Sequence, residues 1–173
     1  TDEIAALVTF NDALTITASA GQLILSGGLR SGLSDITFAG AGTTEVKTVS
    51  LVTGGNVVKN DAGTLLFSIA NTYSGSTLVN AGTLRAGVTN VLPGRTSLVV
   101  ASGATFDVNG TAQSIGSLSG AGTVLNSSAS TSTATITIGR ADTNAVFTGT
   151  IPGRIAVTKV GVGNFVLRRR RWY

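Results

Sequence analysis

The stretch KNDAGTLLFSIANTYSGSTLVNAGTLRAG, residues 59–87, decides the fold of this chain. It contains short runs of apolar and β-branched residues, TLLFSI, STLVN and GTLR, each next to Gly, Asn or Asp. Gly permits the positive φ of a tight corner, and Thr and other β-branched residues suit the strand that follows. The pattern therefore predicts short strands that are connected by turns.

The same turn recurs along the chain, with a small residue and Gly before Thr or Ala and apolar residues after it. The copies are AGAGTTEV at 39–46, NDAGTLLF at 60–67, NAGTLRAG at 80–87, ASGATFDV at 101–108 and SGAGTVLN at 119–126. Roughly twenty residues separate successive turns, which is a spacing typical of solenoids. In a solenoid each coil pairs its strands with the coils above and below and stacks like side chains inside.

We therefore expect an all-β chain, a right-handed single-stranded parallel β-helix of about seven or eight coils, forming one domain over residues 1–173. An antiparallel sandwich or barrel also has many short strands. The recurrent turn makes that alternative weaker. The motif is clearest at 59–87 and restarts at 158–167, TKVGVGNFVL.

A second copy of the pattern follows one hundred residues after Lys59, as KVGVGNFVLRRRRWY at 159–173. In this alignment Gly63 matches Gly163 and Tyr73 falls opposite Tyr173. The four consecutive residues Arg168, Arg169, Arg170 and Arg171 then occupy the places of 68–71. We expect the arginines at a turn after a strand, in register with a repeat unit.

Composition supports β structure and excludes several classes of site. Only 5 % of the residues are aromatic and 12 % charged, whereas Gly occurs 23 times. Without the four arginines, the remaining eight bases balance the eight acids, so the body is neutral. There is no Cys, His or Met, which excludes disulfides, Cys/His zinc sites, histidine acid–base chemistry and a cysteine nucleophile. The chain starts at Thr1 without a recognisable signal peptide, so we expect a processed chain or an excised fragment.

The stretch 59–87 resembles the autotransporter passenger-associated repeat, K-x-G-x-G-x-L-x-L-x-G-x-N-T-Y-x-G-x-T-x-V-x-A-G-T-L-x-x-G. Asp61 and Ile69 depart from it, where the pattern has Gly. The matching positions that we assign a structural repeat role are Gly63, Leu65, Phe67, Asn71, Tyr73, Gly75, Val79, Gly82 and Leu84. The resemblance implies a type V secretion passenger, exported across the bacterial outer membrane to the cell surface. The family's translocator barrel is absent from this chain.

The resemblance implies an adhesin or a self-associating protein, although some passengers of the family carry an enzyme domain. We expect a non-enzymatic function: a structural and adhesive stalk that mediates cell–cell or cell–surface adhesion. The expected partners are the chain itself or host and neighbour cell-surface molecules, with no specific nucleic acid, no cofactor and no metal. The alternative is a carbohydrate-active β-helix enzyme, which needs clustered carboxylates. The acids are dispersed, although stacking could align Asp107 with Asp142.

The arginine run allows several interpretations. Charge at an open solenoid end opposes edge-to-edge stacking, so the run is a candidate end-cap. It could also be an engineered replacement, a native turn of unusual composition, or an anion contact, and the chain would then be an anion-binding module. A separate Thr-rich run, TSTATITI at 131–138, is a candidate for an ice-binding rank. The simpler interpretation is that Thr is a good outward strand residue.

Overall fold

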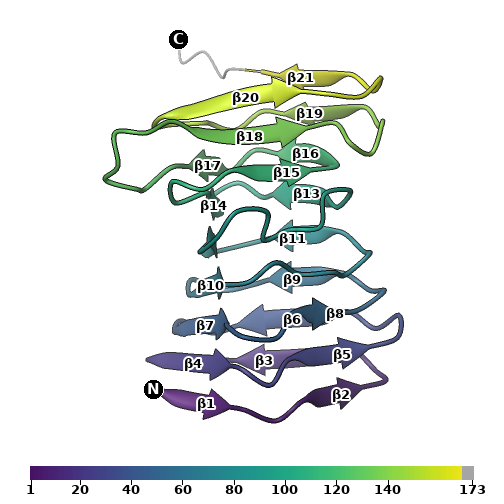
Figure 1. The fold of residues 1–173 in the computed structure, drawn as a ribbon, viewed down its shortest axis with the longest axis vertical. Coiled ribbons are helices and arrows are strands. Elements are labelled where there is room, and N and C mark those ends of the chain that lie inside the picture. Colours follow the sequence, from purple (N-terminus) through teal and green to yellow (C-terminus); the bar gives the residue numbers. More distant parts are fainter. Residues whose placement is uncertain (169–173) are drawn as a thin grey trace.

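The computed structural model describes residues 1–168, which form a right-handed parallel β-helix of eight coils (Figure 1). In Figure 1 the near strands run from left to right and the far strands return from right to left while the chain rises. Twenty-one strands occur in this part of the chain, and no helix. The expected fold is confirmed. No helix of the described residues is long and apolar enough to cross a membrane.

Each coil passes through three faces in turn, and the first face is a seven-stranded parallel sheet. Each of its strands pairs with the equivalent strands of the neighbouring coils. Thr64, for example, pairs with Thr43 on one side and with Thr83 on the other. Its strands are β1 (Asp2–Ile4), β4 (Gln22–Leu25), β7 (Thr43–Val46), β10 (Thr64–Phe67), β12 (Thr83–Ala86), β14 (Thr105–Asp107) and β17 (Thr123–Leu125). In the eighth coil Thr150 adds an isolated parallel bridge to Thr123.

The second face is interrupted, because the fourth and fifth coils have no strand there. It consists of two three-stranded sheets. The lower sheet contains β2 (Val8–Phe10), β5 (Leu29–Ser31) and β8 (Leu51–Val52), and the upper one contains β15 (Gln113–Ile115), β18 (Ala134–Ile138) and β20 (Ile155–Lys159).

The third face is an eight-stranded sheet with one strand from every coil. Side chains alternate between core and surface here: Ile36 and Phe38 are buried, and they pair with the partly buried Leu14 and Ile16 of the first coil. The strands are β3 (Leu14–Thr17), β6 (Ile36–Ala39), β9 (Val57–Lys59), β11 (Thr77–Val79), β13 (Ser97–Val100), β16 (Ser117–Gly120), β19 (Ala145–Phe147) and β21 (Phe165–Leu167).

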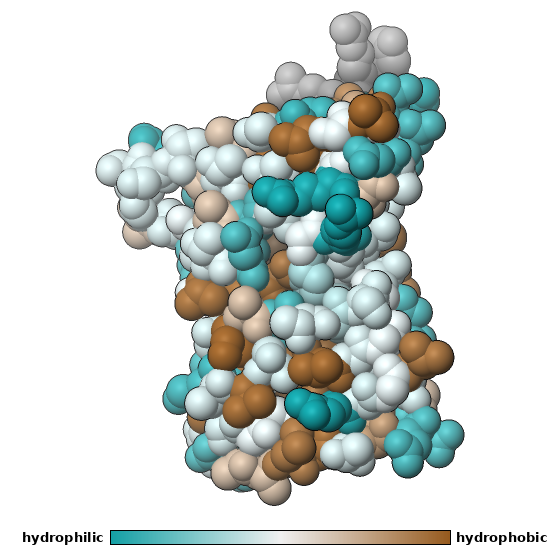
Figure 2. Space-filling view, turned by 45° about the vertical axis from the view of Figure 1, so that its right-hand side comes forward, coloured by the Kyte–Doolittle hydropathy of each residue, from teal (hydrophilic) through white to brown (hydrophobic). Residues whose placement is uncertain are grey.

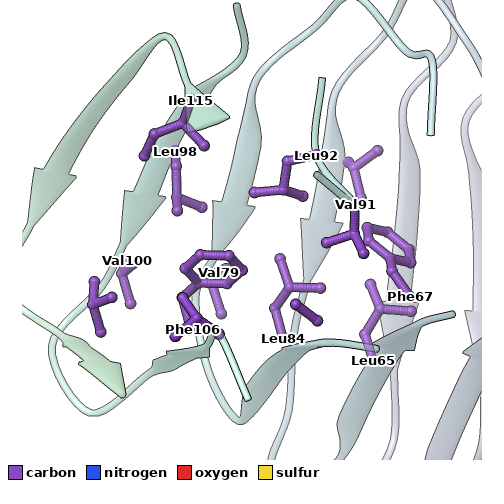
Figure 3. Packing of buried hydrophobic residues seen from close by; sticks show 14 of the residues in the cluster. Leu65, Phe67, Val79, Leu84, Val91, Leu92, Leu98, Val100, Phe106 and Ile115 are labelled. Carbon is purple, nitrogen blue, oxygen red and sulfur yellow. The ribbon is translucent and has the colours of Figure 1, made fainter. Parts of the chain in front are cut away.

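The core is a narrow column of apolar side chains, contributed by alternate residues of all three faces (Figure 3). Large and small side chains alternate along one stack of the first face, where Phe67 lies between Val46 and Ala86. All three side chains are fully buried. This alternation fills the column without overpacking, which explains why few aromatic residues are needed.

The repeat that restarts at Lys159 lies on a different face from its counterpart. The strand after Lys59 is β10 on the first face, whereas the strand after Lys159 is β21 on the third face. The expected register of the two copies is therefore wrong. The seventh coil is longer than its neighbours, since Gly120 pairs with Phe147, whereas Val100 pairs with Gly120 in the coil before it and Phe147 pairs with Leu167 in the coil after it. The extra residues shift the chain by about one face.

Candidate functional site: the repeat coil and the outward corners

The glycines of the repeat lie where two coils approach too closely for a side chain. A Cβ on Gly63 would lie 2.1 Å from the carbonyl oxygen of Gly42, and one on Gly75 would lie 2.2 Å from that of Gly55. Gly82 has a positive φ of 67° and would place a Cβ 2.3 Å from the Gly63 oxygen. These residues set the spacing between coils.

The apolar repeat residues Leu65, Phe67, Val79 and Leu84 are completely buried in the column (Figure 3). Leu65 pairs directly with Leu84 in the next coil. Their side chains offer no surface to a ligand, and their contribution is the burial of apolar area, worth roughly 25 cal/mol per Å².

Asn71 replaces the missing strand of the second face with its side chain. Its Oδ1 accepts a 2.9 Å hydrogen bond from the Leu51 amide of the coil below, and its Nδ2 donates to the Val91 oxygen of the coil above at 3.1 Å. Gln113 continues this ladder, because its Oε1 accepts from the Val91 amide at 3.1 Å. Buried backbone groups that lack a strand partner are thereby satisfied.

Tyr73 is 2 % exposed, and its hydroxyl forms a 2.5 Å hydrogen bond with Thr77 Oγ1. Burial raises the pKa of Tyr73, and the hydrogen bond from Thr77 partly offsets the rise. The ring packs inside the corner. It is therefore a structural residue of the repeat.

Lys59 and Lys159 share a local role, although they lie on different faces. Lys59 Nζ donates to the carbonyl oxygens of Asn60 and Asp61, the latter at 2.8 Å. Lys159 Nζ donates to those of Val160 and Gly161, the latter at 2.9 Å. Burial lowers the pKa of Lys59, with Asp61 opposing the shift. Each lysine holds the turn that follows it.

One ion pair joins three coils on the first face. Arg85 Nε donates to Asp107 Oδ2 at 2.8 Å, and Arg85 Nη2 donates to Ser127 Oγ at 2.9 Å. Asp107 is 1 % exposed and also accepts from the Ser127 hydroxyl and the amides of Ser127 and Asn109. Burial alone would raise the pKa of Asp107, but these hydrogen bonds outweigh it and the pKa lies below its usual value.

A carboxylate held by a serine of the next coil occurs at two further positions on this face. Ser26 Oγ donates to Glu3 Oε1 at 2.5 Å, and Ser68 Oγ donates to Glu45 Oε1 at 2.6 Å. Each carboxylate therefore helps to hold successive coils together. These acids are components of the scaffold.

The longest rank of threonines lies on the first face. It runs in register through Thr43, Thr64, Thr83, Thr105, Thr123 and Thr150. The run at 131–138 forms no rank of that length: Thr135 of β18 pairs with Ala156, and Thr137 pairs with Thr158 above it but with Ser114 below it. A rank forms where threonines of successive coils pair with one another. This register cannot be read from one local stretch of sequence. A single rank fits the simpler interpretation, that Thr faces outward because it suits a strand.

The carboxylates are not gathered into a catalytic or metal-binding cluster. Among residues 1–168, no group of three or more His, Cys, Asp or Glu side chains is placed to hold a metal ion. Asp107 pairs with Leu125 and Arg85, and not with Asp142. The alignment of Asp107 with Asp142, which the enzyme alternative considered, therefore does not occur.

Two hollows lie on the surface of the upper coils. The larger, about 910 Å³, is lined mainly by small and hydroxyl residues of the turns between the third and first faces, together with Ile151, Pro152 and Leu167. None of the described residues that line it is charged. The smaller, about 440 Å³, is lined by Gly94, Arg95, Arg140, Asp142, Val160 and Gly161. Sequence reasoning did not single out these two arginines, which are 45 residues apart. That these two arginines line the same hollow follows only from the register in which the coils stack.

The arginine run lies mostly beyond the described part of the chain. Arg168 is exposed, and its backbone amide donates to the Phe147 oxygen at 2.9 Å, which continues the third face. Arg169, Arg170 and Arg171 are outside the described residues, so the end-cap and anion-contact interpretations stay predictions.

Comparisons with known proteins agree with the repeat architecture. The family Passenger-associated-transport-repeat matches residues 57–86, which span β9 to β12. The chain is also similar to the adhesin BmaC autotransporter of Brucella suis biovar 1 (strain 1330), with 35 % identity over 162 residues, 92 % of this chain. It spans about 4 % of that relative's length. No solved structure matches the chain significantly. The resemblance found in the sequence is thereby confirmed: residues 57–86 match the passenger-associated repeat, and the β-helix as a whole is similar to a short part of an autotransporter adhesin.

Proposed function

We propose that this chain is part of the surface-exposed passenger of a bacterial autotransporter, where it acts as a rigid stalk and an adhesive, self-associating surface. The observation that carries the proposal is the similarity over 92 % of the chain to an adhesin autotransporter. Eight coils whose glycines fix the distance between layers support the stalk role. Export across the outer membrane to the cell surface is part of the same proposal.

The proposed adhesive mechanism is the sum of many weak polar contacts. Outward positions of the first face carry Thr hydroxyls at regular intervals from Thr43 to Thr150. Their spacing is fixed by strand pairing, which separates neighbouring strands by about 4.8 Å. A second copy or another repetitive surface can therefore meet a pre-ordered row, and multivalency raises the avidity. The partners are the chain itself or molecules of a host or neighbouring cell.

The test uses the full-length surface protein that contains this region. We expect cells that display it to aggregate or adhere, and we expect deletion of residues 1–168 to reduce that adhesion. The matched control is a deletion of equal length from another β-helical part of the same passenger, with surface display of each variant measured by antibody. Adhesion that is unchanged by the first deletion and lost with the control deletion would overturn the proposal.

A further inference from the structure

We propose that the corner formed by Arg95, Arg140 and Asp142 is a binding site for an acidic saccharide, a sugar that carries a carboxylate or sulfate beside free hydroxyls. The site lies on the turns between the second and third faces of the fifth, seventh and eighth coils. Figure 2 shows a compact group of strongly hydrophilic side chains on this side of the molecule, in its upper half. The proposal goes beyond the stalk function and does not depend on it.

Stacking of the turns brings the two arginines together. The Arg95 carbonyl would lie 2.3 Å, and the Ala141 Cβ 2.9 Å, from a Cβ on Gly116, so the glycine lets the turns close up. Gly94 leaves open the space beside Arg140, whose Cδ would be 3.7 Å from a Cβ there. The result is a hollow of about 440 Å³ with both arginines on its wall, a size that fits a small ligand.

The positive charge of this corner exceeds the single negative charge of Asp142. Among residues 1–168, neither Arg95 nor Arg140 has a carboxylate oxygen within ion-pair distance, whereas Arg85 has Asp107. Lys159 does not line the hollow, but its Nζ lies beside it, where it donates to the oxygens of the lining residues Val160 and Gly161. Guanidinium groups match the paired oxygens of carboxylates and sulfates in a bidentate geometry.

Asp142 narrows the class of anion. Its backbone has a positive φ of 56°, and its Oδ1 accepts a 3.0 Å hydrogen bond from the Val162 amide. Gly161 makes room for this carboxylate, since a Cβ there would lie 2.3 Å from Oδ1. An ionised carboxylate only accepts hydrogen bonds, so it repels a bare anion and favours a ligand with hydroxyl donors next to its charge. A sugar ring provides both groups.

Other acidic polymers fit this corner less well. Among residues 1–168 no aromatic side chain lines the hollow, so the bases of a single-stranded nucleic acid would find no stacking platform in this part of the chain. An acidic peptide provides carboxylates without the adjacent hydroxyls that Asp142 can accept from. These two polymer classes are therefore the comparisons for the experiment.

The experiment measures binding by calorimetry at physiological salt. It uses two proteins: the 173-residue chain, and a variant of it in which Arg169, Arg170 and Arg171 are replaced by Ser. The probes are a heparin tetrasaccharide, a galacturonate trisaccharide, poly-glutamate and a single-stranded oligonucleotide. We expect at least one of the two saccharides to bind both proteins. The double variant Arg95→Gln with Arg140→Gln should lose about tenfold or more in affinity, as expected for charge-assisted hydrogen bonds.

The matched control is Arg30→Gln with Arg154→Gln, which removes the same charge from exposed residues elsewhere and should change affinity less than twofold. Asp142→Asn should weaken saccharide binding but not the binding of inorganic sulfate. Three results would overturn the proposal: an equal loss of saccharide affinity in both double variants, no saccharide binding once the C-terminal arginines are replaced, or equal affinity for poly-glutamate or the oligonucleotide. Unchanged circular dichroism and melting temperature confirm that each variant is folded.

Discussion

Gly63 has no space for even one additional carbon, because Gly42 of the coil below approaches it directly. We therefore predict that Gly63→Ala destabilises the chain by about 3 kcal/mol, at the upper end of typical overpacking costs. The cost is high because the clashing atom belongs to the backbone and cannot rotate away. Denaturant unfolding followed by circular dichroism measures the change.

The matched control is Gly32→Ala, since nothing lies within 4 Å of the position that its Cβ would occupy and its φ is not in the left-handed region. This variant should be as stable as the original chain within about 0.5 kcal/mol. Equal effects of the two substitutions would show that coil spacing is not set by Gly63.

Asp107 gives the scaffold a pH-dependent contribution. Its pKa is lower in the folded chain than in the unfolded chain, so its stabilising effect is complete above the unfolded pKa and is lost as the pH falls through the folded one. We predict that the free energy of unfolding declines below about pH 4. Asp107→Asn should cost about 2 kcal/mol at pH 7, because Arg85 and Ser127 lose a charged acceptor, and should flatten the acid decline.

Urea unfolding at a series of pH values tests this prediction. Asp12→Asn is the control, because Asp12 is exposed and no hydrogen bond of its side chain occurs among residues 1–168. That variant should retain both the neutral stability and the acid decline of the original chain. If the free energy of unfolding of Asp107→Asn declined at acidic pH as much as that of the original chain, other carboxylates would be responsible for the decline.

At the scale of the elements, the gap in the second face is bridged by amide side chains. Asn71→Ala removes the acceptor of the buried Leu51 amide, and an unsatisfied buried donor costs about 2 kcal/mol. We predict a loss of that size, together with faster hydrogen exchange of the Leu51 amide. The local readout separates this effect from general destabilisation.

Asn80→Ala is the comparison, since Asn80 is exposed and its side chain contacts only Asn60 Oδ1 among the described residues. Its effect on stability should stay within about 0.5 kcal/mol, with no change in the exchange of Leu51. If the Leu51 amide stayed protected from hydrogen exchange in Asn71→Ala, a backbone group of the fourth coil would be its acceptor, and the prediction would be wrong.

The sequence was sufficient to predict many of the strands, the corner glycines and the parallel coils, because each depends on a local pattern such as the alternation at Leu14 and Ile16. The short strands of the lower second-face sheet, such as β2 and β8, were not predicted. The sequence was also not sufficient to assign faces. The same pattern of turn and strand follows Lys59 and Lys159 although it leads to different faces, so the copy at Lys159 seemed equivalent to that at Lys59. The convergence of Arg95 and Arg140 also required the register, since the long seventh coil alters the count of residues between turns.

At the scale of the whole molecule, stability is distributed between neighbouring coils, because each strand pairs only with the coils next to it. The apolar column is less covered at its ends, where Val8 and Phe10 in the first coil and Phe165 in the eighth are only partly buried. Charge is also unequal along the axis. Residues 1–61 contain six acids and three bases, and residues 62–173 contain two acids and nine bases. Contact between two C-terminal ends is therefore opposed by repulsion.

The end-cap hypothesis predicts that the arginine run keeps two C-terminal ends apart. Replacing Arg168, Arg169, Arg170 and Arg171 by Ser should increase association of the purified chain at high concentration, and added salt should have the same effect on the original chain by screening. Sedimentation measures the association. Because the chain contains no Cys, Val162→Cys, at an 88 % exposed position of the eighth coil, can report contact between C-terminal ends by disulfide formation.

Leu33→Cys is the matched reporter, since Leu33 is 85 % exposed and lies in the second coil. Disulfide formation should rise in the serine variant at Val162 but not at Leu33, because only contact between C-terminal ends is released. A serine variant that stays as monomeric as the original chain would exclude the end-cap. Reduced association would instead mean that the arginines attract the acidic first coil, where Asp2, Glu3 and Asp12 lie, and that copies join head to tail.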